Sequence, residues 1–194
     1  MIPELYEGET VLIVGNAASA LRRRRKIPPE WKVCRLNRGF PKKRRGFIGS
    51  RTDIIATSTP LNEETVAEEY GLWHKGELIS MPDLVWMTPS DHRLKDDDFW
   101  KDQARYPRDR WEKLQKALGG EARPSTGMMA IDYFCYYIKP AKIYLLGFDH
   151  GMSHTFYWTD KQKERGHPHT HSYPDEERLI ETFYSPFCSL EYLK

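Results

Sequence analysis

Two hydroxyl residues and a glycine stand where a helix is expected to begin, a combination that can bind an anion. The expected helix covers 125–138, follows Pro124 and opens with Ser125, Thr126 and Gly127. The first N–H groups of a helix lack partners within it, and the helix dipole places partial positive charge at the same end. A phosphate group could therefore bind there. An ordinary helix cap made by the same hydroxyl groups explains the pattern equally well.

Two asparagines follow short apolar runs that are expected to form buried strands. TVLIVG at 10–15 ends in Gly15 and is followed by Asn16, while KVCRLN at 32–37 ends in Asn37. Ligands of open α/β sheets bind at the carboxyl ends of the strands, so Asn16 could hydrogen-bond a base, a ribose or a phosphate. The spacing is not G-x-G-x-x-G, so a dinucleotide fingerprint is not supported. Taken alone, each asparagine is explained more simply by a tight turn or a strand end.

Five histidines lie near the carboxyl end of the chain: His150, His154, His167, His169 and His171. An imidazole titrates near neutral pH, so His171 could remove a proton from a hydroxyl group. Glu176 opens the last expected helix and could orient or polarise that imidazole, although a carboxylate is also favourable at a helix N-terminus by itself. The H-x-H-x-H pattern at 167–171 could in principle bind zinc, but no nearby cysteine completes such a site. We therefore expect no metal, and an exposed loop with incidental histidines is the main alternative to catalysis.

Three charged segments have less specific interpretations. The three aspartates at 96–98 contain an Asp-x-Asp spacing that can hold a metal–diphosphate complex, but their charged, loop-like surroundings favour solvated surface. The basic runs Arg22–Lys26 and Lys42–Arg45 are normally solvated as well. Their density also suits an anionic partner, such as a phosphorylated glycan, an anionic lipid or a nucleic acid.

The elements that must position these residues alternate between strand and helix. Strands are expected at 10–15, 32–37, 53–58, 77–81, 84–87 and 142–147, and helices at 17–25, 62–70, 109–118, 125–138 and 175–184. Residues 154–174 read as a loop. This alternation predicts an α/β fold with a mostly parallel sheet covered by helices on both faces.

Length and composition indicate a globular chain. The 194 residues are 39% apolar and 30% charged, with a net charge of +2, so the chain as a whole is not a polycation. We expect a single domain over 1–194, with an N-terminal half at 1–122 and a C-terminal half at 123–194. The apolar run Val11–Val14 is too short to cross a bilayer, and no signal peptide precedes it. Three widely spaced cysteines provide no disulfide framework, so we expect reduced thiols and a cytoplasmic protein.

Taken together, these segments resemble the sialyltransferase family that includes the animal Golgi enzymes. VLIVGNAASAL, VCRLNRGF and SRTDIIATS resemble the long sialylmotif in order and spacing, and PSTGMMAIDYFCYYIKPAKIYLLGF resembles the short sialylmotif. HTFYW at 154–158 resembles the third motif. His171 and Glu176 match the very short motif, His-x4-Glu. The matches occur in family order and span about residues 10 to 180.

The resemblance implies a Rossmann-like fold of three α/β/α layers, of the single-sheet glycosyltransferase type. It also implies inverting, metal-independent transfer of a sugar from a CMP-activated donor to a hydroxyl acceptor, with no cofactor. By position, Asn16 and Asn37 would contact CMP, and Ser125, Thr126 and Gly127 would hold its ribose and phosphate. His154 would steady the departing phosphate, and His171 would deprotonate the acceptor.

The chain also departs from the family. The family's long motif begins with a cysteine that bridges to the short motif, but this chain has Thr10-Val11-Leu12 there, so Cys135 lacks that partner. The donor sugar could be sialic acid or Kdo, and the acceptor could be a glycan or another hydroxyl compound, including an anionic one. The alternative function is a non-catalytic nucleotide- or nucleic-acid-binding module that uses the basic runs, or a transferase that modifies nucleic acid.

Overall fold

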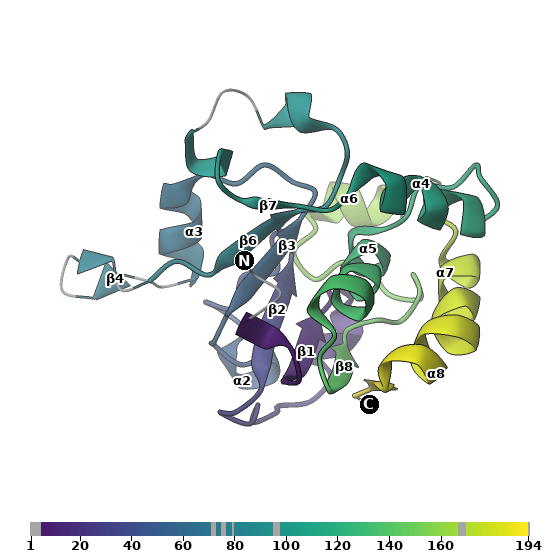
Figure 1. Ribbon diagram of the computed structural model, residues 1–194. Helices are drawn as coiled ribbons and strands as arrows, with labels where there is room; N and C mark the ends of the chain where they lie inside the picture. The colour runs from purple at the N-terminus through teal and green to yellow at the C-terminus, as the bar shows by residue number, and fades with distance from the viewer. Residues whose placement is uncertain are drawn as a thin grey trace.

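Seven parallel strands form one central sheet, as the alternating sequence pattern predicts (Figure 1). The computed structural model describes residues 5–70, 73–74, 77–78, 80–94, 98–166 and 170–193. The sheet order is β7-β6-β3-β2-β1-β8-β9. The strands are β1 (Thr10–Val14), β2 (Lys32–Leu36), β3 (Ile54–Thr57), β6 (Asp83–Trp86), β7 (Ala104–Arg105), β8 (Lys142–Leu146) and β9 (Leu190–Tyr192). A separate antiparallel pair consists of β4 (Trp73–His74) and β5 (Glu77–Leu78).

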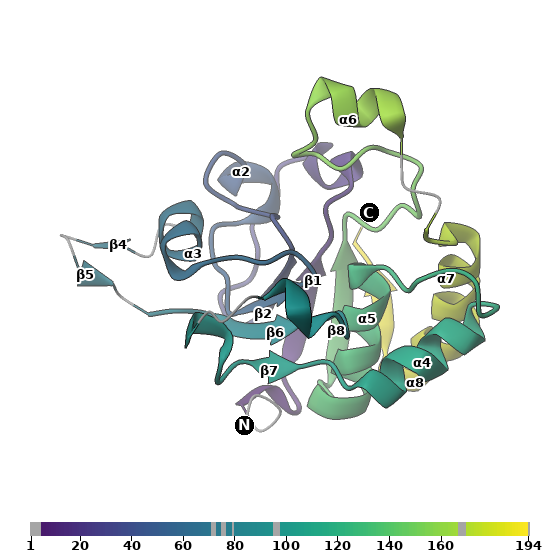
Figure 2. The ribbon, with the colours of Figure 1, turned by 90° about the horizontal axis from the view of Figure 1, so that it is seen from above.

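Helices cover both faces of the sheet, which gives three layers (Figures 1 and 2). The α-helices are α2 (Arg45–Ile48), α3 (Glu63–Tyr70), α4 (Arg108–Ala117), α5 (Thr126–Tyr133), α6 (Asp160–Arg165), α7 (Tyr173–Leu179) and α8 (Ser185–Cys188). Among the shorter elements, η1 (Ala18–Leu21), η2 (Asp91–Arg93) and η3 (Asp98–Trp100) are 3-10 turns, whereas η4 (Phe134–Ile138) and η5 (Ile180–Tyr184) are π-helical. The predicted three-layer α/β architecture is thus confirmed.

The strands are buried on both faces, so alternate residues belong to different cores. Val11 and Ile13 pack with α4, α5 and the α7–α8 segment, whereas Leu12 and Val14 pack with η1 and α2. A third cluster joins β3 and β6 to α3 through residues such as Trp86. Burial on both faces explains why the strands read as continuous apolar runs in the sequence.

The order of strands in the sheet changes direction at β1: the strands that follow β1 in sequence are added on one side of it, until β8 is added on the other side. Strand β1 pairs with β2 on one side and with β8 on the other, and a reversal of this kind leaves a crevice at the carboxyl ends of the two strands. Gly15 and Gly147 follow these strands. A Cβ atom on Gly15 would lie 2.4 Å from the carbonyl oxygen of Gly147, and Gly147 has a φ of +73°. Larger residues would therefore force the two strand ends apart.

Helix α5 and the α7–α8 segment pack alongside each other, and two polar contacts connect them. Ser125, the N-cap of α5, binds Glu176 in α7, and the buried carboxylate of Asp132 in α5 accepts a hydrogen bond from Tyr184 in η5. The partners are 51 and 52 residues apart in sequence, so the two helical segments run in the same direction.

A disulfide bond joins the same two segments. Cys135 in η4 and Cys188 in α8 are bonded, with Cα atoms 5.6 Å apart and a sequence separation of 53. The expectation of three reduced thiols is therefore wrong for this pair, while Cys34 is a free, buried cysteine. The resemblance to the long motif concealed this pairing, because the partner of Cys135 comes from the C-terminal helix and not from the region around Thr10.

Several predicted elements differ from the observed ones. The helix predicted at 17–25 is only the short η1, because the Arg22–Lys26 run concentrates like charges where the helix would have to continue. The predicted loop at 154–174 contains α6, which begins with a capping box between Thr159 and Gln162. Strands β7 and β9 are too short to produce a sequence pattern. Asn62 caps α3, since its Oδ1 accepts from the N–H of Thr65 at 2.9 Å. No helix in the described ranges is long and apolar enough to span a bilayer.

Candidate functional site

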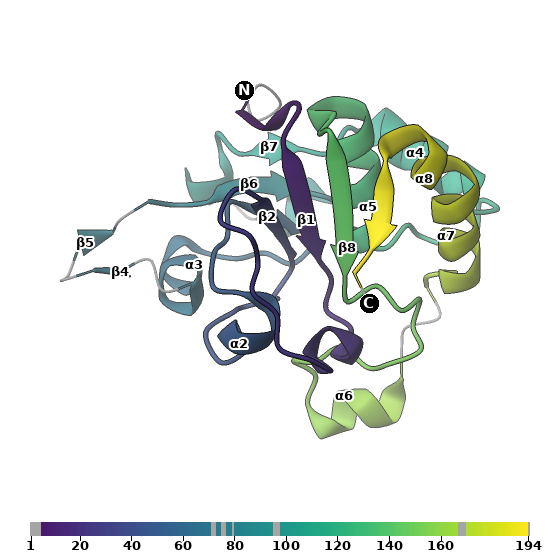
Figure 3. The same ribbon diagram turned by 90° about the horizontal axis from the view of Figure 1, so that it is seen from below.

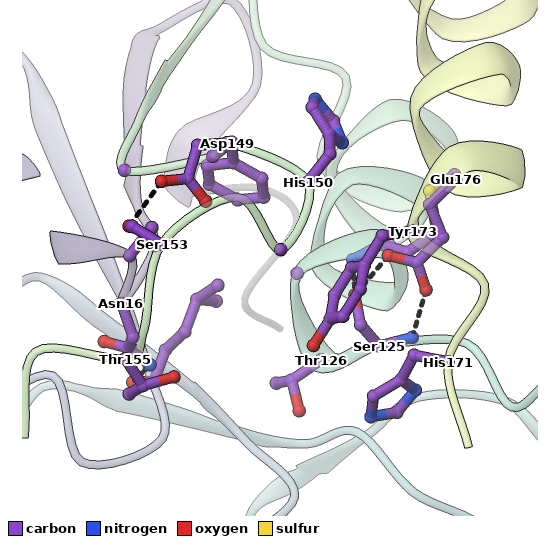
Figure 4. Close-up of a pocket in the computed structure, with 18 of the residues that line it drawn as sticks. Asn16, Ser125, Thr126, Asp149, His150, Ser153, Thr155, His171, Tyr173 and Glu176 are labelled. Atoms are coloured by element: carbon purple, nitrogen blue, oxygen red, sulfur yellow. Dashed lines mark hydrogen bonds between the residues drawn. The ribbon is translucent and has the colours of Figure 1, made fainter. Parts of the chain in front are cut away.

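A pocket of about 240 Å³ opens at the carboxyl ends of β1 and β8, at the reversal point of the sheet (Figure 4). Figure 3 shows both strands ending at this side of the molecule, with α6 beyond them. The pocket lining includes every predicted site residue except His154: Gly15, Asn16, Asn37, Ser125, Thr126, Gly127, His171 and Glu176. The fold thus brings together residues from four separate parts of the chain.

Glu176 binds the start of α5. Its two carboxylate oxygens accept hydrogen bonds from the backbone N–H and the hydroxyl of Ser125, both at 2.6 Å (Figure 4). The Ser125 hydroxyl oxygen also accepts from the N–H of Met128 at 3.1 Å, which makes it the cap of the helix. Burial raises the pKa of Glu176 to about 7, and the two Ser125 hydrogen bonds oppose this rise.

This contact changes two predicted roles. Glu176 was expected to orient His171, but its carboxylate is bound to Ser125 instead. Ser125 was expected to hold a phosphate directly, yet both of its donor groups are used by Glu176. The N–H groups of Thr126 and Gly127, in the first turn of α5, have no partners within the helix. They are the donors that this helix start can offer to a ligand.

Asn37 and Thr126 belong to one hydrogen-bond network across the pocket wall. Asn37 has a φ of +49°, and its Oδ1 accepts from the N–H of Ser58 at 2.8 Å. Its Nδ2 donates to the Thr126 hydroxyl at 3.2 Å, and that hydroxyl donates to the Ser58 hydroxyl at 3.0 Å. The network ties the end of β2 to the start of α5 and fixes the Asn37 amide in place.

Asn16 retains an unused acceptor. Its Nδ2 donates to the carbonyl of Leu36 at 2.9 Å, while its buried Oδ1 has no partner among the described residues. Gly39 packs closely against this oxygen, since a Cβ on Gly39 would approach it to 2.6 Å. A buried acceptor without a donor is costly, so Asn16 is a candidate for contact with a ligand N–H or O–H group.

His171 is held in one tautomer by the chain that precedes α5. Its Nδ1 lies 2.7 Å from the carbonyl oxygen of Arg123, and the N–H of Arg123 donates to the carbonyl of Thr170 at 2.7 Å. Because a carbonyl oxygen only accepts, Nδ1 must carry the proton, and in the neutral ring the lone pair is on Nε2. The ring therefore presents a basic nitrogen, as a general base requires.

His154 lies outside the pocket. Its side chain is exposed near Trp158, with ring centroids 6.1 Å apart. Its backbone carbonyl accepts from the N–H of Ala18 at 2.9 Å, next to an isolated β-bridge between Ala17 and Thr155. His154 is therefore not part of the pocket lining, and its contact with a departing phosphate stays a prediction.

Gly127 is required by packing. A Cβ atom at this position would lie 2.8 Å from Cε1 of Phe148, the residue that follows Gly147 at the end of β8. The ring of Phe148 is the group that approaches Gly127 in this structure, and close approach of a phosphate to the glycine stays a prediction. The glycine thus lets the end of β8 pack directly on α5.

The pocket also contains polar side chains to which the sequence assigned no specific role. The hydroxyl groups of Tyr157 and Tyr173 are protonated at neutral pH, since burial raises the pKa of both, that of Tyr173 to about 12. Asp149 accepts from the hydroxyl of Ser153, and both lie on the segment that crosses the pocket after β8 (Figure 4). The signal available for the tyrosines was their position in the His/aromatic region 154–173.

The histidine and aspartate clusters provide no metal site in the part of the chain that the structure describes. His167, His169, Asp96 and Asp97 lie outside the described residues. His150 is bound elsewhere, with its Nε2 3.0 Å from the hydroxyl of Tyr192. Burial lowers the pKa of His150, so this ring favours the neutral form.

Neither a protein-family model nor a curated protein sequence matches the chain, whereas solved structures match its fold. The α-2,3-sialyltransferase Cst-I from Campylobacter jejuni is 17% identical with a TM-score of 0.61, covering 96% of this chain and 76% of its own. The sialyltransferase CstII from Campylobacter jejuni, solved with cytidine-5'-monophosphate, is 16% identical with a TM-score of 0.56 and coverages of 96% and 80%.

A mammalian sialyltransferase, solved with a Gal-beta-1-3GalNAc glycoside, also matches. It is 13% identical with a TM-score of 0.58, and the match covers 99% of this chain and 71% of the mammalian chain. The bacterial and mammalian matches agree with the architecture described above. The protein therefore has a sialyltransferase-like fold.

Proposed function

We propose that the protein is a glycosyltransferase that moves a sialic-acid-like or Kdo-like sugar from a CMP-activated donor to a hydroxyl acceptor. The observation that carries the proposal is the pocket at the β1/β8 reversal point, which gathers the residues of four motif-like segments. Three structures with the same fold are sialyltransferases, two from Campylobacter jejuni and one from a mammal, and one of them is bound to CMP.

In this proposal the donor nucleotide binds along the wall formed by Asn16, Asn37 and α5. The unpartnered Oδ1 of Asn16 would accept from a donor group of the nucleotide. The first-turn N–H groups of Thr126 and Gly127 would receive the phosphate, with help from the helix dipole. Glu176 and Ser125 then act as positioning residues that fix this helix start. The hydroxyls of Tyr157 and Tyr173 could donate further hydrogen bonds to the phosphate, a role that the sequence assigned to His154.

Transfer would proceed as a single displacement. His171 removes the proton of the acceptor hydroxyl at Nε2, and the acceptor oxygen forms a bond to the anomeric carbon of the sugar. The bond from that carbon to the phosphate oxygen breaks on the opposite side, so the configuration inverts and CMP leaves as an anion. Hydrogen-bond donors can stabilise that charge without a divalent cation, because they are already oriented in the folded protein.

The test is CMP release from CMP-sialic acid and from CMP-Kdo in the presence of candidate acceptors. His171→Ala should lower the rate by at least about a hundredfold, as expected for loss of a general base. His92→Ala, an exposed histidine in η2, serves as the matched control and should retain the rate. Absence of turnover with both donors, together with no CMP-induced rise in melting temperature relative to CDP, UDP and ADP, would refute the proposal.

A further inference from the structure

A second cavity, about 820 Å³ in volume, adjoins the nucleotide pocket and is lined mainly by cations. It is lined by the segment after β2 and by helix α6. We call it the basic groove and define it by six side chains: Arg38, Lys42, Lys43, Arg44, Lys161 and Arg165. Glu69 is the acidic residue in its described lining.

Among the described residues, no carboxylate forms an ion pair with the cations of the groove, although Lys163 on α6 does pair with Asp160. Lys161 and Arg165 are one turn apart on α6, where like charges oppose helix formation. A concave surface with this imbalance concentrates positive potential and attracts anions.

One guanidinium in the groove is held in position. Arg44 donates from Nη2 to the carbonyl of Phe156 at 3.3 Å, and its guanidinium lies 4.6 Å from the centroid of the Phe156 ring. The other groove cations extend from Arg38, Lys42 and Lys43 on one side and from α6 on the other. An arginine that is already held in position, beside lysines with long and flexible side chains, suits a ligand that carries an acidic group. The rest of such a ligand can vary in structure.

The basic groove is continuous with the nucleotide pocket. Tyr157 lines both cavities, and Arg38 directly follows Asn37, which lines the pocket. A molecule in the groove therefore lies next to the nucleotide and does not replace it. The charge of Arg38 also acts on Tyr157, where it lowers the pKa against the larger effect of burial.

We infer that the basic groove binds the acceptor, and that the acceptor is an acidic glycan bearing a carboxylate, sulfate or phosphate group near the hydroxyl that is modified. This inference rests on the proposed function, because it assigns the pocket beside the groove to the donor. An extended nucleic acid fits less well, since the net charge is only +2 and the other basic run lies at a separate cavity that also contains Glu177 and Glu181.

The experiment measures binding of fluorescently labelled lactosides that are unmodified or carry one sulfate, phosphate or carboxylate. The wild-type protein should bind the acidic lactosides at least about tenfold more tightly than the neutral one at low ionic strength, and added salt should reduce the difference. Lys42→Glu/Lys43→Glu should abolish the preference. Arg22→Glu/Arg23→Glu makes the same change of net charge in the other basic run and should retain it.

The outcomes separate the two proposals. Equal binding of acidic and neutral lactosides, or an equal loss in both double variants, would overturn the acceptor assignment. Tighter binding of a single-stranded DNA oligonucleotide that depends on Lys42 and Lys43 would overturn it as well. CMP-induced thermal stabilisation, measured on the same three proteins, tests the donor site alone. If CMP stabilises all three equally while no acidic preference exists, the acceptor assignment fails and the proposed function stands.

Discussion

Replacing Glu176 by glutamine should remove a specific dependence of stability on pH. In the folded protein burial raises the pKa of this carboxyl from 4.5 to about 7. At a pH between these two pKa values, the carboxyl of Glu176 keeps its proton in the native state and has lost it in the unfolded state. Stability must therefore fall as pH rises from about 4.5 to about 7, and the contribution is constant above and below this window. At about 1.4 kcal/mol per pH unit, the loss across the window is about 3 kcal/mol.

The assay is chemical denaturation of wild type and Glu176→Gln at several pH values from 4.5 to 8. The free energy of unfolding of the wild type, minus that of the variant, should decrease by about 3 kcal/mol across this range. The amide has one carbonyl acceptor, as the protonated carboxyl of Glu176 has, and it does not titrate in this range. The slope of the difference therefore reports only the titration of the wild-type carboxyl.

Glu121→Gln, which changes an exposed carboxylate to the same amide, is the control and should show no such slope. A difference between wild type and Glu176→Gln that stays constant from pH 4.5 to 7 would refute the reasoning. It would mean that the hydrogen bonds from Ser125 and the dipole of α5 compensate the burial of the carboxylate completely.

Three further predictions concern the framework of the site. Gly127→Ala forces a methyl group to within 2.8 Å of Phe148 and should cost about 1–3 kcal/mol in unfolding free energy, whereas Gly46→Ala, with its nearest contact at 3.7 Å, should cost little. Arg110→Met leaves the buried Asp132 carboxylate without its cation and should lower the free energy of unfolding by about 3–5 kcal/mol. The double variant Arg110→Met/Asp132→Asn should recover most of this loss. Similar stability of the single variant and the wild type would contradict the prediction. Alkylation of the unfolded protein should label only Cys34 before reduction and all three cysteines after it, and full labelling without reductant would disprove the Cys135–Cys188 bond.

Local sequence patterns were sufficient for the five central strands of the sheet, but not for the short edge strands β7 and β9. Runs such as TVLIVG at 10–15 are apolar because parallel strands are buried on both faces, and the glycine that follows marks the turn. The ordered motif-like segments also predicted which residues would meet, because the carboxyl ends of parallel strands lie at one edge. Asn16, Asn37 and the start of α5 converge for this reason.

Partners across the fold could not be read from the same patterns. Ser125 and Glu176 are 51 residues apart, and nothing local indicates that the carboxylate binds the serine and not the nearby His171. The Cys135–Cys188 bond depends in the same way on how the last helix packs. Helix α6 was predictable in principle, since Thr159 and Gln162 have capping-box spacing, but the surrounding aromatics and histidines concealed it.

The paired helices have a mechanical consequence for the pocket. Glu176 and Tyr184 connect the α7–α8 segment to α5, and Cys188 connects it to η4, the element that continues α5. Because these three contacts follow one another along the segment, it can neither rotate about one end nor slide along its neighbour without breaking one of them. The wall of the pocket that carries Ser125 is therefore rigid. Any change in the width of the pocket has to come from the opposing wall, the segment 148–166, which the bridge between Ala17 and Thr155 attaches to the end of β1.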